Sequence, residues 1–190
     1  MRCFLAVETT DELRQELGKL QRELSGRVPG MRWVRPEQMH LTLEFFGEVA
    51  ESFPVRAAES LAAACAGHGV FQARLAGLGA FPAPHRARVL WVGMEAGREE
   101  LVEVQRSIGA ALKSVGVHVE ERPYTPHLTL GRLRMPADLS ALVGCEQAGA
   151  QVAPFAGRFF PVTRVVLIKS ELHPEGPRYT ELASYPLGPA

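Results

Sequence analysis

His40-Leu41-Thr42-Leu43 is repeated as His127-Leu128-Thr129-Leu130, and this duplicated segment decides how the chain folds. The two copies lie 87 residues apart, each follows a proline within a few residues, and each opens a predicted strand. A four-residue word repeated in matched context indicates a duplicated structural unit. We therefore predict a molecule built with pseudo-two-fold symmetry around the two segments.

The strand period determines which side chains of each copy act together. Successive residues of a strand point to opposite faces, so His40 and Thr42 share one face while Leu41 and Leu43 share the other. The leucines anchor the strand in a core and leave the histidine and threonine on the open face. If the symmetry brings the two open faces together, one cleft holds two imidazoles on opposite walls with a hydroxyl beside each.

This arrangement suits displacement at a phosphodiester. In-line attack needs a base on one side of phosphorus and an acid on the other, and two imidazoles with unperturbed pKa values of about 6.5 supply both. The hydroxyls of Thr42 and Thr129 can donate to the non-bridging oxygens, where negative charge gathers in the transition state. Arg132 would help to bind phosphate, but it lies five residues after His127, an odd offset that turns it to the opposite face unless a bulge intervenes.

The rest of the chain reads as a mixture of strands and helices without regular strand–helix–strand alternation. This pattern predicts an α+β fold with largely antiparallel strands. Leucine and alanine periodicity predicts helices after Asp11, over 52–66 and over 98–115, with a short helix from Asp138 to Val143. Strands are predicted over 2–8, 31–35, 38–46, 70–79, 87–94, 117–120, 127–133, 155–160, 162–171 and 178–183.

Composition narrows the function classes. The chain has 190 residues, is 46% hydrophobic and 22% charged, and carries no formal net charge, which argues against a broad non-specific grip on nucleic acid. It has no apolar run long enough to span a membrane and no secretory signal, so we expect a cytoplasmic protein. The three cysteines, Cys3, Cys65 and Cys145, are too scattered for a disulfide framework or a zinc cluster.

The segment from Pro36 to Val49 resembles the first motif of the two-histidine phosphoesterases, and the segment from Arg122 to Arg132 resembles their second motif. Within that superfamily the chain looks most like the RNA 2′,3′-cyclic phosphodiesterases, also called 2′-5′ RNA ligases. The stretches 2–7, 81–93 and 170–179 fit the same pattern, so the resemblance spans nearly the whole chain.

The resemblance implies a single two-lobed domain over residues 1–190, with two antiparallel sheets lining a central cleft and helices outside. It implies metal-independent hydrolysis of a 2′,3′-cyclic phosphate to a 2′-phosphomonoester, with His40 as proton donor and His127 as proton acceptor. The same step with an RNA 5′-hydroxyl in place of water would form a 2′-5′ linkage without ATP. No cofactor is expected, and no nucleotidyl-lysine or P-loop motif is present.

Aromatic side chains near the motifs could stack on a terminal base, as recognition of single-stranded RNA often requires. Of five such residues, we select Tyr124, Phe46 and Phe81 as base-stacking candidates. The expected partner is an RNA end or nucleotide bearing a 2′,3′-cyclic phosphate, bound by a monomer. Three alternatives stay open: a phosphodiesterase for small cyclic nucleotides or ADP-ribose cyclic phosphate, a non-catalytic RNA-end binding module, and a metal hydrolase that uses both histidines as ligands.

Overall fold

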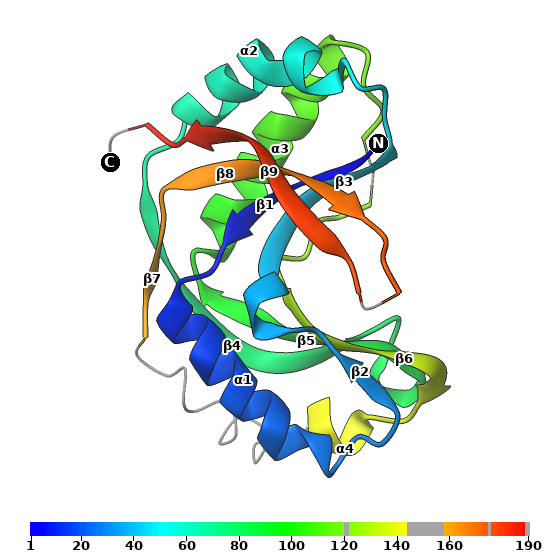
Figure 1. The fold of residues 1–190 in the computed structure, drawn as a ribbon. Coiled ribbons are helices and arrows are strands. Elements are labelled where there is room, and N and C mark those ends of the chain that lie inside the picture. Colours follow the sequence, from blue (N-terminus) through cyan, green and yellow to red (C-terminus); the bar gives the residue numbers. More distant parts are fainter. Residues whose placement is uncertain (120–121, 144–157, 175, 189–190) are drawn as a thin grey trace.

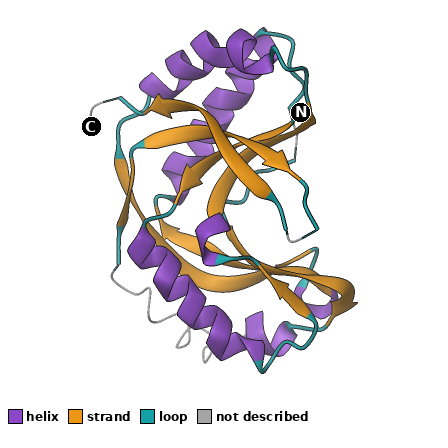
Figure 2. Ribbon diagram, in the orientation of Figure 1, coloured by secondary structure: helices purple, strands orange, loops and turns teal. Residues whose placement is uncertain are grey.

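The computed structural model describes residues 1–119, 122–143, 158–174 and 176–188, and it confirms the α+β fold (Figures 1 and 2). The strands are β1 (Arg2–Glu8), β2 (Met31–Trp33), β3 (His40–Glu48), β4 (Phe71–Phe81), β5 (Ala87–Ala96), β6 (Leu128–Ala137), β7 (Phe160–Val162), β8 (Arg164–Glu171) and β9 (Arg178–Pro186). The helices are α1 (Asp11–Ser25), α2 (Phe53–Ala66), α3 (Arg98–Ser114) and α4 (Ser140–Val143), with 3-10 turns at η1 (Pro36–Gln38) and η2 (Pro84–Arg86).

The strands form two antiparallel groups that meet at the repeated segments. They run in the order β7-β4-β5-β6-β3-β1-β8-β9, and β2, which lies off this path, also pairs with β6. One half of this order contains the first repeat and the other half contains the second. The expected two sheets are joined where Leu41 of β3 pairs with Leu128 of β6, so the lobes form one strongly curled sheet.

Helices cover the outer side of each lobe because each presents one apolar stripe to the sheet (Figure 1). Helix α1 is capped by the Thr10 hydroxyl, which accepts from the Leu13 amide at 3.3 Å. It buries leucines at helical spacing: Leu13, Leu17, Leu20 and Leu24. Gln21 of α1 donates to the carbonyl of Leu130 at 2.9 Å and so fastens this helix to the second lobe. Helices α2 and α3 pack on each other and on the first lobe.

Two predicted strands need correction. The one at 117–120 is wrong for the described residues 117–119, because Gly116 turns the chain with a φ of +73° and the Val117 amide donates back to the Leu112 carbonyl at 2.9 Å. The segment therefore closes α3 and pairs with no strand. Of the strand predicted at 155–160, residues 155–157 lie outside the described part, and β7 begins at Phe160. Within the described ranges, no helix combines the length and apolar character needed to cross a membrane.

Candidate active site

The two histidine segments lie antiparallel and side by side at the junction of the lobes. Leu41 pairs with Leu128, and both side chains are fully buried. Extending this antiparallel register by one residue each way puts His40 beside Thr129 and Thr42 beside His127. Directly opposed residues share a face of the sheet, and diagonal neighbours such as the two histidines lie about 7–8 Å apart. Four polar side chains thus form a two-by-two group on the open face.

Both imidazoles are oriented by the same local hydrogen bond. Nδ1 of His40 lies 2.8 Å from the Gln38 carbonyl oxygen, and Nδ1 of His127 lies 2.7 Å from the Thr125 carbonyl oxygen. A carbonyl can only accept, so Nδ1 carries the proton in each ring. The Nε2 atom of each neutral imidazole therefore holds the lone pair that accepts or, once protonated, returns a proton.

Each histidine is also held against two aromatic rings of its own lobe. Phe4 stacks on His40 with ring centroids 4.6 Å apart, and Tyr179 meets the same imidazole edge-on at 5.5 Å. Phe81 meets His127 edge-on at 5.0 Å, and Trp91 lies tilted against it at 5.8 Å. The equivalent packing restricts both rings to one orientation.

Burial and positive charge keep both imidazoles neutral in the free protein. Burial lowers the pKa of His40 to about 4, the charge of Arg132 pushes the pKa the same way, and a proton on His127 would do so as well. The Gln38 carbonyl and the Glu8 carboxylate oppose that shift. The pKa of His127 is lowered by burial and by Arg132. An anion bound between the rings would offset these effects and favour protonation.

A bulge after each repeated segment decides which later side chain reaches the cleft. In β6, Thr129 pairs with Trp91 and Gly131 with Leu90, so Leu130 is the extra residue. In β3, Thr42 pairs with Ala6 and Glu44 with Leu5, so Leu43 is the extra residue in the same place. Because of this extra residue, a side chain five positions after the histidine points to the same face as the histidine. Arg132 is turned to the open face, against the expectation for an unbroken strand.

The open face of the two segments borders a cleft of about 570 Å³. Its walls include His40, Thr42, Thr129 and Arg132. His127 is not among the lining side chains; it lies next to them, beside Thr42 in the register and against Phe81 and Trp91. The structure thus brings together the five residues that the sequence selected for proton transfer and phosphate binding, with Arg132 included because of the bulge.

The aromatic candidates are placed differently from expectation. Phe46 packs against Phe53 of the core at 4.8 Å, and the Tyr124 hydroxyl is buried, which raises the pKa of that phenol. Neither lines the cleft. Phe81 packs on His127 and serves as its wall. The aromatic side chain that the β3 bulge turns into the cleft is Phe45, which is 51% exposed there.

Sequence reasoning also missed a set of arginines. Besides Arg132, the cleft is lined by Arg2, Arg32 and Arg35, and none of its described lining residues is acidic. Arg2 lies over the ring of Phe45, 5.6 Å from its centroid. Their contribution could not be read from the sequence, because the net charge is zero and these positions gather only when β1 and β2 reach the same cleft.

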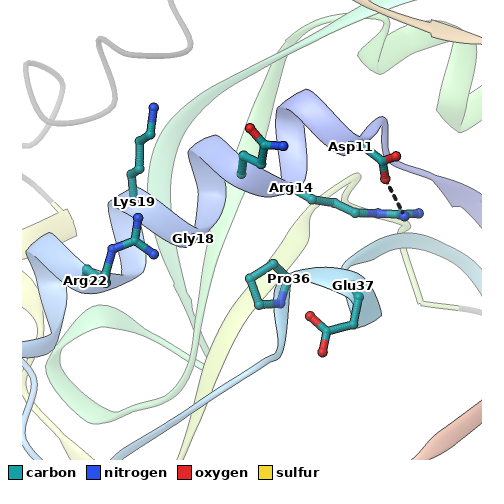
Figure 3. A pocket seen from close by; sticks show the side chains of 8 residues that line it. Asp11, Arg14, Gly18, Lys19, Arg22, Pro36 and Glu37 are labelled. Carbon is teal, nitrogen blue, oxygen red and sulfur yellow. Dashed lines mark hydrogen bonds and ion pairs between the residues drawn. The ribbon is translucent and has the colours of Figure 1, made fainter.

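A second hollow lies on the outside of the molecule, between α1 and η1 (Figure 3). It carries Arg14, Lys19 and Arg22, but Asp11 and Glu37 lie among them, and Arg14 pairs with Asp11 at 3.1 Å. It contains neither histidine nor threonine of the repeated segments. The mixed charge and open surface distinguish it from the cleft at the lobe junction.

Known proteins share this architecture. The sequence profile of the 2′-5′ RNA ligase superfamily matches residues 7–174. The RNA 2′,3′-cyclic phosphodiesterase of Methanothermobacter thermautotrophicus is 34% identical over 98% of this chain and 99% of its own length. That of Archaeoglobus fulgidus is also 34% identical, over 96% of this chain and 98% of its own.

Solved structures agree with the sequence relatives. A crystal structure of a Thermus thermophilus protein superimposes with a TM-score of 0.78 at 28% identity, covering 100% of this chain and 99% of that one. E. coli LigT in apo form gives a TM-score of 0.71 at 22% identity, covering 98% and 97% of the two chains, and so shares the fold. The repeated histidine segments, the curled antiparallel sheet and the full-length matches together place this chain in the 2′-5′ RNA ligase superfamily, among the two-histidine phosphoesterases.

Proposed function

We propose that this protein is an RNA 2′,3′-cyclic phosphodiesterase that opens the cyclic ester to a 2′-phosphomonoester. The observation that carries the proposal is the antiparallel pairing at Leu41 and Leu128, which sets two His-x-Thr pairs on one open face. The relatives of about 34% identity that bear this activity in their names match over nearly the full chain. Their names refer to RNA, which makes a cyclic-phosphate RNA end the proposed substrate.

The reaction is a single in-line displacement. Nε2 of neutral His127 takes a proton from water as the water oxygen attacks phosphorus. The bond from phosphorus to the 3′ oxygen breaks on the opposite side, and protonated His40 gives its Nε2 proton to that oxygen. The phosphate stays on the 2′ oxygen. A second proton exchange with solvent returns each imidazole to its starting form, and each histidine is expected to contribute about 10²–10⁴-fold to the rate.

The assignment of donor and acceptor comes from the family resemblance, since the two segments are locally alike. The lowered pKa of His40 is compatible with that role: its imidazolium is a strong acid once formed. The negative phosphate and the Glu8 carboxylate both favour that imidazolium. Substrate binding would therefore favour protonation of His40, which then supplies the proton that the leaving 3′ oxygen needs.

The remaining cleft groups stabilise charge and position the substrate. Thr42 and Thr129 lie beside the opposite histidines, where their hydroxyls can donate to the two non-bridging oxygens. Arg132 supplies a planar guanidinium suited to bidentate contact with phosphate. Phe45 offers an exposed ring for the terminal base, in place of Phe46 and Tyr124.

The same centre would form a 2′-5′ linkage if an RNA 5′-hydroxyl replaced water, since the strained cyclic ester supplies the driving force. Hydrolysis dominates in this account because water is always present at the site.

One chain carries both histidine segments, so a monomer holds the whole proposed machinery. Among the described residues, no three His, Cys, Asp or Glu side chains gather as a metal site would need.

The test is product analysis of a short oligoribonucleotide ending in a 2′,3′-cyclic phosphate. Phosphorus NMR, run with excess chelator, should show conversion to the 2′-phosphomonoester alone. A 3′-phosphate product, or activity that disappears on chelation, would contradict the proposed mechanism. Binding of the RNA end without turnover would instead favour the non-catalytic binding module.

A further inference from the structure

We propose that Arg32 forms a second phosphate subsite, which holds the internucleotide phosphate next to the cyclic end and makes the enzyme prefer oligonucleotides to mononucleotides. This inference rests on the proposed function, because it assigns a neighbouring subsite of the same cleft. It is carried by one juxtaposition: Arg32 of β2 pairs directly with Arg132 of β6, and both line the cleft.

Two arginines in directly opposed positions are unfavourable without an anion between or beside them. Directly opposed residues in antiparallel strands place their side chains on one face with Cβ atoms about 5 Å apart, and like charges there destabilise the pair. Arg32 and Arg132 are both exposed, and neither has an ion-pair or side-chain hydrogen-bond partner in the described part of the chain. The fold thus maintains two uncompensated guanidiniums side by side.

The other residues that line the cleft do not supply the missing negative charge. No described residue lining the cleft is acidic, and Arg2 and Arg35 add to its positive side. A cyclic phosphate end carries a single negative charge. That charge is already faced by Arg132 and the two histidines, whose pKa values the Arg132 charge lowers. A second anion adjacent to the first would neutralise more of the positive charge in the cleft than one phosphate alone.

The two arginines are placed differently relative to the histidine segments. Arg132 follows Thr129 on the strand that carries the second histidine segment, and its charge acts on both imidazoles. Arg32 lies on the neighbouring strand β2, where it pairs with Arg132 and with neither histidine segment. Arg132 is thus placed for the reacting phosphate and Arg32 for a phosphate beyond it. In RNA with a cyclic 3′ end, that neighbour is the phosphodiester on the 5′ side of the terminal nucleotide.

The experiment compares three substrates with the intact protein: adenosine 2′,3′-cyclic phosphate, the adenylyl dinucleotide with the same end, and that dinucleotide with an uncharged methylphosphonate linkage. We expect wild-type kcat/KM to be about tenfold higher for the charged dinucleotide than for either other substrate. Arg32→Met should lower kcat/KM about tenfold for the charged dinucleotide and less than twofold for the other two.

Salt dependence provides an independent readout. Each phosphate contact to single-stranded nucleic acid contributes about −0.7 to the slope of log affinity against log salt. The slope of log kcat/KM for the charged dinucleotide should become about 0.7 less steep in the Arg32→Met variant. It should not change for the methylphosphonate dinucleotide.

Arg22→Met is the matched control, because Arg22 is an exposed arginine in the outer hollow of Figure 3 and the substitution removes the same charge. It should leave all three substrates unchanged. Equal losses for Arg32→Met on all three substrates would place Arg32 on the reacting phosphate and overturn the second subsite. Equal losses for Arg22→Met and Arg32→Met would show general attraction without a defined subsite. Absence of turnover on every substrate by the wild-type protein would instead refute the proposed function.

Discussion

Phe45 and Arg132 occupy the same position in the two repeated segments, five residues after the histidine, and both face the cleft. The bulges at Leu43 and Leu130 produce this equivalence, since each shifts the strand by one residue just after its threonine. The symmetric backbone thus presents an aromatic ring on one wall and a guanidinium on the other. This asymmetry fits a nucleotide, which has a flat base at one end and a phosphate at the other.

Replacing Phe45 tests its role as a base platform. Because stacking on an aromatic ring is worth about 1–3 kcal/mol per base, Phe45→Ala should raise KM for a cyclic-phosphate RNA end roughly tenfold while changing kcat little. Phe46→Ala is the contrasting variant: Phe46 packs on Phe53, so its loss should lower the melting temperature and leave KM unchanged. Steady-state kinetics and thermal unfolding measure both. An increase in KM for Phe46→Ala but not for Phe45→Ala would show that Phe46 is the base-stacking residue, as the sequence predicts.

Stability should depend on pH through His40. Its folded pKa of about 4 lies below the unfolded value of about 6.5, so the unfolded chain takes up the proton first as pH falls. The neutral ring therefore stabilises the fold above pH 6.5, and about 3 kcal/mol of that stability is lost between pH 6.5 and 4. His127 changes in the same direction.

Urea unfolding at a series of pH values measures this dependence. His40→Asn should flatten the slope in that window, whereas replacing the exposed His173 should not. An unchanged slope in the His40 variant would show that its imidazole is not buried in neutral form.

The separate roles of the histidines can be tested with a better leaving group. A 3′-thio cyclic substrate expels a thiolate, which needs no proton from an acid. The His40→Ala variant should recover most of its lost rate on this substrate, while His127→Ala should not, because water still needs a base. The comparison is the ratio of kcat/KM for the thio and oxygen substrates in each variant. Rescue of His127→Ala instead would show that His127 is the proton donor and His40 the proton acceptor.

Gly79 controls the wall behind His127. A Cβ atom at this position would lie 2.1 Å from the Trp91 ring, which also packs on His127. Gly79→Ala should therefore displace the indole, destabilise the fold by about 1–3 kcal/mol and reduce kcat. Gly26→Ala is the control, since a Cβ there meets nothing within 4 Å and the backbone φ is −71°. Equal melting temperatures for the two variants would contradict this packing.

Much of the site could be predicted from the sequence because the decisive residues repeat and the strand period is local. The alternation of His40, Leu41 and Thr42 fixes their faces wherever the strand lies in the fold. The helices could also be predicted from the sequence, since leucines at helical spacing in α1 face the core as expected. The α+β arrangement followed from the order of these elements.

The bulges could not be predicted, and they explain why Phe45 replaces Phe46 in the cleft and why Arg132 reaches it. Leu43 and Leu130 look like ordinary strand residues, and their extra position emerges only from pairing with β1 and β5. An unbroken strand would turn Arg132 away from the cleft and put Phe46 in it. Arg32 was missed for a related reason: its pairing with Arg132 depends on long-range register.

The rates of His40→Ala, His127→Ala and the double variant on a cyclic-phosphate oligonucleotide test the central claim most directly. If both imidazoles act on one phosphorus, each single variant should lose about 10²–10⁴-fold in kcat, with folding retained by circular dichroism. Because they act as a unit, the double variant should be little slower than the poorer single one. Either single variant retaining wild-type kcat would contradict the claim.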